Sequence, residues 1–145
     1  MRAELGERGL RFDDDRPTVA FSELHRRYEA RNPSRKRLVG YRVDGELLDV
    51  ASQKACDYLL GIPHEQKVYL VELKGHHLRQ AVGQLRESLG RLSKQLQGKM
   101  ISGRVVLSRV SRPDIRASET LTLARALAAT GGDLRYKSIR LTEEI

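Results

Sequence analysis

The clearest constraint on the fold is an apolar stripe that begins at Leu78 and continues to about Gln97. Its side chains recur at helical spacing: Leu78, Ala81, Val82, Leu85, Leu89, Leu92 and Leu96. A helix with such a stripe is stable only when another layer covers it. The run Lys67–Lys74 directly before it is β-rich and mostly apolar, which suits the centre of a sheet, and Gly75 ends it. The sequence therefore predicts a mixed α/β layer fold.

Local signals predict the other elements of this fold. They are a helix over about 18–30, two strands over 38–50 joined at Asp44–Gly45, a strand over 55–60, a strand over 104–110, a helix over 118–130 and an edge strand over 134–141. Residues 1–16 are predicted to be a flexible N-terminal arm, and residues 17–145 a single domain with a mixed central sheet flanked by helices.

Length and composition exclude several classes of protein. A chain of 145 residues suits one domain with a real core. The single cysteine, Cys56, excludes an internal disulfide framework and a cysteine-based zinc cluster, and it is expected to be a small core residue. No apolar run is long enough for a membrane span, and no signal-peptide pattern opens the chain. We therefore expect a soluble protein of a reducing compartment, the cytoplasm, with no membrane partner.

Positive charge is concentrated in one part of the chain. Residues 74–116 carry ten Lys and Arg against two Asp and Glu, whereas basic and acidic residues balance on either side of this segment. A local excess of this size attracts polyanions and favours contacts with phosphate backbones. The sequence predicts a positively charged surface over 74–116 and a nucleic-acid partner.

Three charged residues are predicted to meet on one face of the sheet. If Leu60 pairs with Lys67 across an antiparallel hairpin, Asp57 faces Leu70. Because strand side chains alternate, Glu72 and Lys74 project from the same face as Leu70. Asp57, Glu72 and Lys74 would then converge, whereas a register shift by a single residue would separate them.

Such a constellation predicts metal-assisted chemistry on a phosphate. Two neighbouring carboxylates repel, and burial adds a desolvation cost that a divalent cation offsets. Oxygen ligands of this kind suit Mg²⁺ or Mn²⁺. The adjacent Lys74 would orient or deprotonate the attacking water and stabilise charge on a phosphate oxygen. The simpler alternative is a strand-end salt bridge between Glu72 and Lys74 with a coincidental Asp57.

The spacing of Asp57 from Glu72–Leu73–Lys74 resembles the signature of the PD-(D/E)xK nuclease superfamily, which includes restriction endonucleases and archaeal-type Holliday junction resolvases. The resemblance covers about residues 19–110 and implies a restriction-endonuclease-like αβββαβ core. It implies that Asp57, Glu72 and the Leu73 backbone carbonyl hold the metal, and that Asp57, Glu72 and Lys74 are catalytic. Cys56 stands where many members have a proline. Many members also carry a glutamate on the first helix, for which Glu29 is a better candidate than Glu23.

Several functional alternatives remain open at this stage. The first is a metal-dependent nuclease that cleaves DNA, including branched DNA, with Gln84, Arg79 and Arg86 contacting the nucleic acid. The second is a catalytically silent nucleic-acid-binding module of the same fold, and the third is a basic protein that binds a protein partner. By analogy with the resolvases, a homodimer is an additional expectation. The sequence does not decide between DNA and RNA or between endo- and exonuclease.

Overall fold

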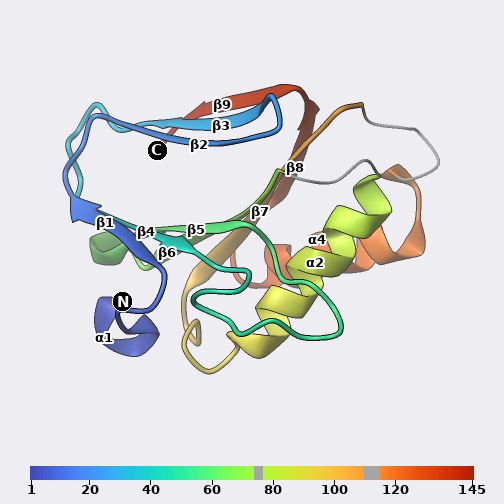
Figure 1. The fold of residues 1–145 in the computed structure, drawn as a ribbon, viewed down its shortest axis with the longest axis horizontal. Helices are drawn as coiled ribbons and strands as arrows, with labels where there is room; N and C mark the ends of the chain where they lie inside the picture. The colour runs from blue at the N-terminus through green and yellow to red at the C-terminus, as the bar shows by residue number, and fades with distance from the viewer. Residues whose placement is uncertain (74–76, 110–114) are drawn as a thin grey trace.

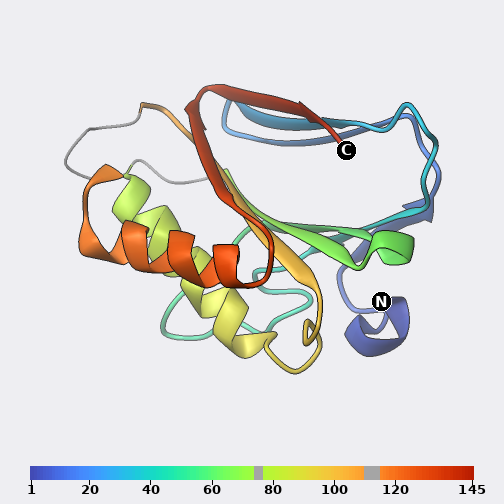
Figure 2. The same ribbon diagram turned by 180° about the vertical axis from the view of Figure 1, so that it is seen from behind.

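The computed structural model describes residues 1–73, 77–109 and 115–145, and these form three stacked layers. Figure 1 and the reverse view in Figure 2 show a small sheet lying over one face of a large mixed sheet, with two helices on the opposite face. The described residues contain nine strands and three α-helices. The predicted mixed α/β class is therefore confirmed.

The large sheet has six strands in the order β1-β4-β5-β6-β7-β8. Their bounds are β1 Leu10–Asp14, β4 Leu38–Arg42, β5 Tyr58–Ile62, β6 Lys67–Glu72, β7 Met100–Leu107 and β8 Leu134–Ser138. Strands β1, β4, β5 and β6 pair antiparallel, whereas β7 pairs parallel to β6 and β8 parallel to β7. Each parallel step needs a crossover, which the two helices supply.

The crossover helices are α2 (Leu78–Arg91) and α4 (Ser118–Ala129), and both predictions are confirmed. Helix α2 is shorter than predicted, but Leu92 and Leu96 in the turns after it remain buried in the same core. This core fills the layer between the helices and the large sheet, with inward side chains such as Val68 and Leu70 of β6. The apolar stripe is therefore covered as its periodicity requires.

The small sheet replaces a helix that we predicted. Residues 18–30 form a hairpin of β2 (Thr18–Glu23) and β3 (Arg26–Arg31), and β9 (Arg140–Glu144) pairs parallel to β3. The predicted helix was wrong because Val19 and Phe21, and then Tyr28 and Ala30, also alternate at strand spacing, and these side chains pack against the large sheet. Tertiary packing selected the strand pattern.

The first 16 residues are ordered rather than a flexible arm. A short helix, α1 (Arg2–Leu5), leads into β1, which pairs with β4, and Leu5 is buried in the core. Asp13 accepts hydrogen bonds from Arg37 at 2.7 Å and from Arg2 at 2.9 Å. Asp13, which lies in the segment predicted to be a flexible arm, thus helps to fix the first strand.

The turn at Asp44–Gly45 forms as predicted, with Gly45 at φ 78°, but the strand expected after it does not. The edge segment predicted over 134–141 divides at Ile139 (φ 68°), so that β8 belongs to the large sheet and β9 to the small one. A 3₁₀ turn, η1 (Pro63–Glu65), connects β5 and β6. These connections align the strands that carry the candidate site.

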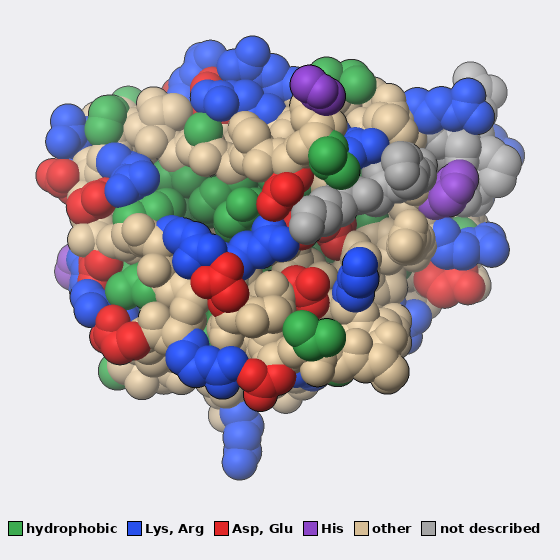
Figure 3. All heavy atoms as spheres, in the orientation of Figure 1, with side chains coloured by type: hydrophobic (Ala, Val, Ile, Leu, Met, Phe, Trp, Pro, Cys, Tyr) green, Lys and Arg blue, Asp and Glu red, His purple; other side chains and the backbone are tan. Residues whose placement is uncertain are grey.

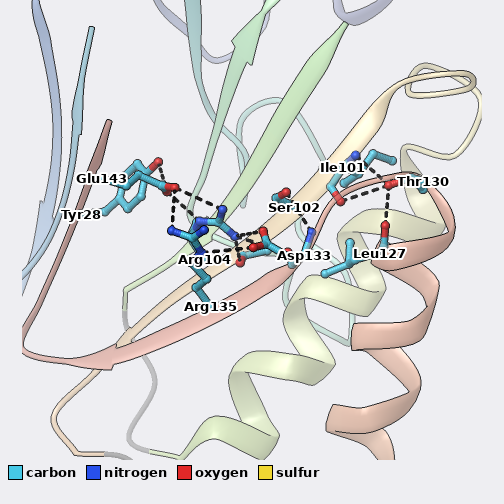
Figure 4. Close-up of polar contacts among 10 residues, drawn as sticks. Tyr28, Ile101, Ser102, Arg104, Leu127, Thr130, Asp133, Arg135 and Glu143 are labelled. Atoms are coloured by element: carbon cyan, nitrogen blue, oxygen red, sulfur yellow. Dashed lines mark hydrogen bonds and ion pairs between the residues drawn. The ribbon is translucent and has the colours of Figure 1, made fainter. Parts of the chain in front are cut away.

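A buried ion-pair cluster joins the two sheets (Figure 4). Arg104 of β7 is 3% exposed and donates to Glu143 of β9 at 2.6 Å and 3.2 Å, and it forms an ion pair with Asp133 at 2.8 Å. The hydroxyl of Tyr28 donates to the same Glu143 at 2.8 Å, and Arg135 approaches it at 3.7 Å. Burial alone would lower the pKa of Arg104, but its carboxylate partners raise it, so the guanidinium stays charged. We name these residues the Arg104 cluster.

Candidate functional site

The two acidic residues that we predicted to meet, Asp57 and Glu72, lie together at one end of the large sheet. Asp57 directly precedes β5, and Glu72 is the last residue of β6. The register differs from our prediction, because Leu60 pairs with Tyr69 instead of Lys67. This shift of two residues preserves the alternation of side chains, so the predicted convergence of these two residues survives the error.

One backbone group links the two carboxylates. The N–H of Leu73 donates to Asp57 Oδ2 at 2.8 Å and to Glu72 Oε1 at 3.0 Å. Both oxygens thus lie within hydrogen-bond reach of a single nitrogen. The two residues are 3% and 1% exposed, respectively. Two acidic groups held this close and away from water create the concentrated negative charge that a cation stabilises.

Three residues that the sequence analysis did not assign extend this group toward the small sheet. Arg42 of β4 lies 3.4 Å from Asp57 Oδ1 and donates to Glu23 of β2 at 2.9 Å. The hydroxyl of Tyr58 donates to the same Glu23 oxygen at 3.3 Å. Burial alone would lower the pKa of Arg42, but Asp57, Tyr58 and Glu23 raise it. We name Glu23, Arg42, Asp57, Tyr58 and Glu72 the carboxylate cluster.

Glu23, and not Glu29, is the glutamate near the site. In a helix Glu23 would point away from the apolar stripe, but in a strand it shares the inward face of Phe21. Glu29 instead pairs with Arg27 at 3.0 Å and with Arg140 at 3.4 Å. The Glu29 expectation was therefore wrong, and strand alternation was the signal that identifies Glu23.

Burial also raises the pKa of Tyr58, with a further increase from Glu23, so its phenol stays protonated at neutral pH. Its ring stacks on Phe21 with centroids 4.3 Å apart. Tyr58, Phe12, Arg11 and Arg16 help to line a cavity of about 340 Å³, and Figure 3 shows hydrophobic side chains in a hollow between the layers on the face it presents. The carboxylate cluster therefore adjoins an opening between the two sheets.

The helix side of the site is fixed by Cys56. Its backbone N–H donates to Ser88 of α2 at 2.7 Å, and its side chain is buried in the core, as predicted. Burial raises the pKa of the Cys56 thiol, so the group stays neutral. This contact holds the residue before Asp57 against α2.

The three residues predicted to contact nucleic acid lie along α2. Gln84 and Arg79 line a cavity of about 380 Å³ together with Lys54, and Arg86 lines a neighbouring cavity of about 360 Å³. Arg79 and Arg86 are exposed. The Gln84 Oε1 atom is buried with no hydrogen-bond partner among the described residues. The structure thus brings cationic and amide groups together on this face of the helix.

The predicted positive surface over 74–116 is only partly present. Lys99 is buried beside Glu4 at 3.4 Å, and Arg104 is buried in its cluster, so neither is available at the surface. Figure 3 shows Lys and Arg side chains interspersed with Asp and Glu on the face it presents. Charge counted along the chain therefore overestimated the charge exposed by this segment.

The carboxylate pair has donors that suit a divalent cation. Oxygen donors from Asp57 and Glu72 match the preference of Mg²⁺ and Mn²⁺. Within residues 1–73, 77–109 and 115–145, no group of three or more His, Cys, Asp and Glu forms a metal site. Additional ligands would thus come from backbone oxygens or water. Lys74, predicted to act beside the pair, lies outside the described residues.

The chain matches no family model, no curated protein and no solved structure in comparisons with known proteins. In the part of the chain that the structure describes, no helix is long and apolar enough to cross a membrane. The carboxylate cluster is therefore the feature of the molecule that bears most directly on its function.

Proposed function

We propose that the protein is a metal-dependent nuclease that hydrolyses phosphodiester bonds in DNA. The observation that carries this proposal is the pair of buried carboxylates, Asp57 and Glu72, bound to the single N–H of Leu73. Buried acidic pairs are costly unless a cation compensates them, and a divalent cation beside a phosphate is a common arrangement for hydrolysis.

The order of elements supports this proposal. Antiparallel strands β4, β5 and β6, then helix α2, then β7 parallel to β6 follow the strands, helix and last strand of the αβββαβ core that the sequence resembles. The first helix of that core has no counterpart here, because the β2–β3 hairpin occupies the corresponding sequence. Glu23 on this hairpin would take the place of the first-helix glutamate.

Each residue has a proposed role. Asp57, Glu72 and the Leu73 carbonyl would hold Mg²⁺ or Mn²⁺, which would polarise the phosphate and favour deprotonation of the attacking water. Arg42 orients Asp57, and Glu23 holds Arg42 in place. Lys74 would orient the water and stabilise charge on the phosphate, while Arg79, Arg86 and Gln84 would contact the backbone of the DNA.

One observation favours a second candidate, a nucleic-acid-binding module without catalysis. Both oxygens of Asp57 already have partners, because Oδ1 lies 3.4 Å from Arg42 and Oδ2 accepts from Leu73. A cation supplied by the chain itself reduces the need for a metal. This alternative predicts that the protein binds DNA and does not cleave it.

The test combines cleavage and metal binding. Linear, circular, single-stranded and four-way-junction DNA would be incubated with the protein in Mg²⁺, Mn²⁺ or EDTA, and Mn²⁺ binding would be titrated by calorimetry. A nuclease cleaves at least one substrate in either metal and none in EDTA, and Lys74→Ala abolishes cleavage while it retains DNA binding. DNA binding that does not depend on metal, without cleavage, supports the non-catalytic nucleic-acid-binding module instead. Neither binding nor cleavage favours a protein-partner-binding role.

A further inference from the structure

The loop that precedes β5 is fixed to helix α2 at both of its ends. At one end Arg91 Nη2 donates to the carbonyl of Asp49 at 2.9 Å, and at the other the N–H of Cys56 donates to Ser88 at 2.7 Å. Residues 50–54, between these two contacts, are exposed. Figure 1 shows the loop beside α2. The loop therefore stands along the helix as a second wall.

Two neighbouring cavities lie between this loop and α2, and we name them together the loop–helix groove. They have volumes of about 380 Å³ and 360 Å³, and both are lined by Gln53 of the loop and Gly83 of the helix. Among the described residues, a Cβ atom placed on Gly83 would meet a single side-chain atom, Gln53 Nε2 at 3.5 Å. The missing side chain of Gly83 therefore leaves the floor of the groove open.

Gly83 weakens the helix that carries it. It lies in the interior of α2, where glycine is less favourable than alanine because it loses more conformational freedom on folding. An alanine would fit, since the contact with Gln53 would be at an ordinary van der Waals distance. The fold thus does not require a glycine here. What Gly83 provides is open space beside the helix backbone, as at sites where a ligand approaches the backbone closely.

The loop–helix groove is positively charged. Lys54, Arg79 and Arg86 line it, and none of the three has an ion pair within the described part of the chain. Glu87 is the acidic residue among the described lining residues. Arg11 of β1, by contrast, has a carboxylate partner. The cations of the groove are therefore available to an anion from outside the chain.

Amide groups add hydrogen-bonding capacity of both kinds to the groove. Gln53, Gln80 and Gln84 line it, and the Gln84 Oε1 atom is buried with no partner among the described residues. A buried acceptor without a donor costs free energy until a donor reaches it. DNA has groups that match both needs, because its phosphate oxygens accept hydrogen bonds and its base amino groups donate them.

The groove lies on the same side of the large sheet as the carboxylate pair. Asp57 shares the face of Leu59 and Glu72 that of Leu70, and both leucines pack in the core beneath α2. The chain passes from Lys54 of the groove to Asp57 in three residues. The loop that walls the groove therefore continues directly into the candidate site.

We propose that the loop–helix groove binds the backbone of one DNA strand, with a phosphate held over Gly83. This inference rests on the proposed function, because it names where the substrate of that site binds, and it adds Gln53, Lys54 and Gly83 to the contacts. Arg79 lies four residues before Gly83 and Arg86 three residues after it, so all three share one face of α2. The two guanidinium groups and the Lys54 ammonium would thus surround the phosphate.

The test compares Gly83→Leu with Gly90→Leu, which adds the same side chain at an exposed position of the same helix. Binding of a fluorescently labelled DNA duplex would be measured in EDTA, so that neither metal binding nor cleavage contributes. We expect Gly83→Leu to weaken DNA binding at least about tenfold, Gly83→Ala to weaken it less and Gly90→Leu to match the wild type. Equal DNA binding by Gly83→Leu and wild type, or no DNA binding by wild type, would overturn the inference.

Unfolding separates a binding role of Gly83 from a structural one. Gly83→Ala should raise the melting temperature by about 2–4 °C, because alanine is the better helix former and its Cβ fits. A variant that is more stable but binds DNA more weakly has lost the space for its ligand and kept its fold. A lower melting temperature for Gly83→Ala would identify Gly83 as a structural residue and contradict the proposal.

Lys54→Met tests the loop wall of the groove. It should lower the slope of log DNA affinity against log salt by about one, as for one lost phosphate contact. Lys137→Met, which removes the same charge from an exposed position on β8, should leave the slope unchanged. An unchanged slope for Lys54→Met, or equal changes in the two variants, would contradict the role of the loop.

Cleavage assays distinguish this inference from the proposed function. If the wild type binds DNA through the groove but cleaves it in neither Mg²⁺ nor Mn²⁺, the nuclease proposal fails and the groove remains supported. If the wild type cleaves DNA and Gly83→Leu both binds and cleaves it as the wild type does, the groove proposal fails and the nuclease remains.

Discussion

The molecule contains two buried polar clusters of different character. In the Arg104 cluster a single arginine is surrounded by Glu143 and Asp133, so every charge has an opposite charge in contact. In the carboxylate cluster two acids, Asp57 and Glu72, accept hydrogen bonds from one N–H, that of Leu73. The Arg104 cluster holds the layers together, whereas the carboxylate cluster gathers the acidic groups that, under the proposed function, would hold a metal.

The strongest test of this contrast is the removal of Arg104. Arg104→Leu leaves Glu143 buried without its main cation, and loss of one partner of a buried ion pair costs about 3–5 kcal/mol of the free energy of unfolding. Urea denaturation followed by circular dichroism measures the effect. Arg135→Ala, which removes a cation that is 57% exposed, should cost less than about 1 kcal/mol. Equal losses of unfolding free energy in the two variants would contradict the structural role assigned to Arg104.

Asp57→Asn tests the carboxylate cluster, and we expect a large loss of cleavage with little loss of stability. Cleavage should fall at least about a hundredfold, equivalent to about 2.7 kcal/mol of transition-state stabilisation, because a neutral amide holds a divalent cation poorly. The free energy of unfolding should change by less than about 1 kcal/mol, since the amide oxygen still accepts from Leu73. Cleavage rates and urea curves for the same protein samples provide both values. A loss of stability comparable to that of Arg104→Leu would mean that Asp57 is structural.

A matched pair of glutamate variants tests which glutamate, Glu23 or Glu29, belongs to the carboxylate cluster. Glu23→Gln should lower the cleavage rate about tenfold, because it weakens the hold on Arg42 and thereby the orientation of Asp57. Glu29→Gln should leave the rate within about twofold, because Glu29 contacts arginines on the outer part of the small sheet. Initial rates at saturating Mg²⁺ measure both. A larger loss of cleavage rate in Glu29→Gln than in Glu23→Gln would identify Glu29 as the glutamate of the site.

The smallest expected effect concerns the pH dependence of stability, away from both clusters. Arg37 and Arg2 lower the pKa of Asp13 to about 2, below its unfolded value, so its contribution to stability is present above about pH 4 and is lost as the pH falls toward 2. Asp13→Asn should remove at most about 1 kcal/mol of stability at pH 7 and almost none at pH 2. Thermal unfolding at a series of pH values compares the two proteins. A difference that grows as the pH falls would contradict this assignment.

Local sequence patterns were sufficient to predict a helix or strand where the apolar residues fit only one periodicity. The stripe from Leu78 onward, the apolar run of β6 and the residues of α4 predicted elements that the structure contains, with errors only at their ends. The convergence of Asp57 and Glu72 was also predictable, because strand alternation survives a register error of two residues.

The small sheet was decided by tertiary structure. Phe21 and Tyr28 satisfy both a helical and a strand pattern, and only packing against the large sheet distinguishes the two. That choice reversed the directions of Glu23 and Glu29 and placed Arg26 inside. The pairing of β1 with β4 separately gave structure to the expected N-terminal arm. Tertiary structure also decided how much positive charge is exposed. Lys99 and Arg104 count toward the basic segment in the sequence, but they are buried and paired with acidic residues. Periodicity records which residues share a face, and long-range packing determines what that face meets.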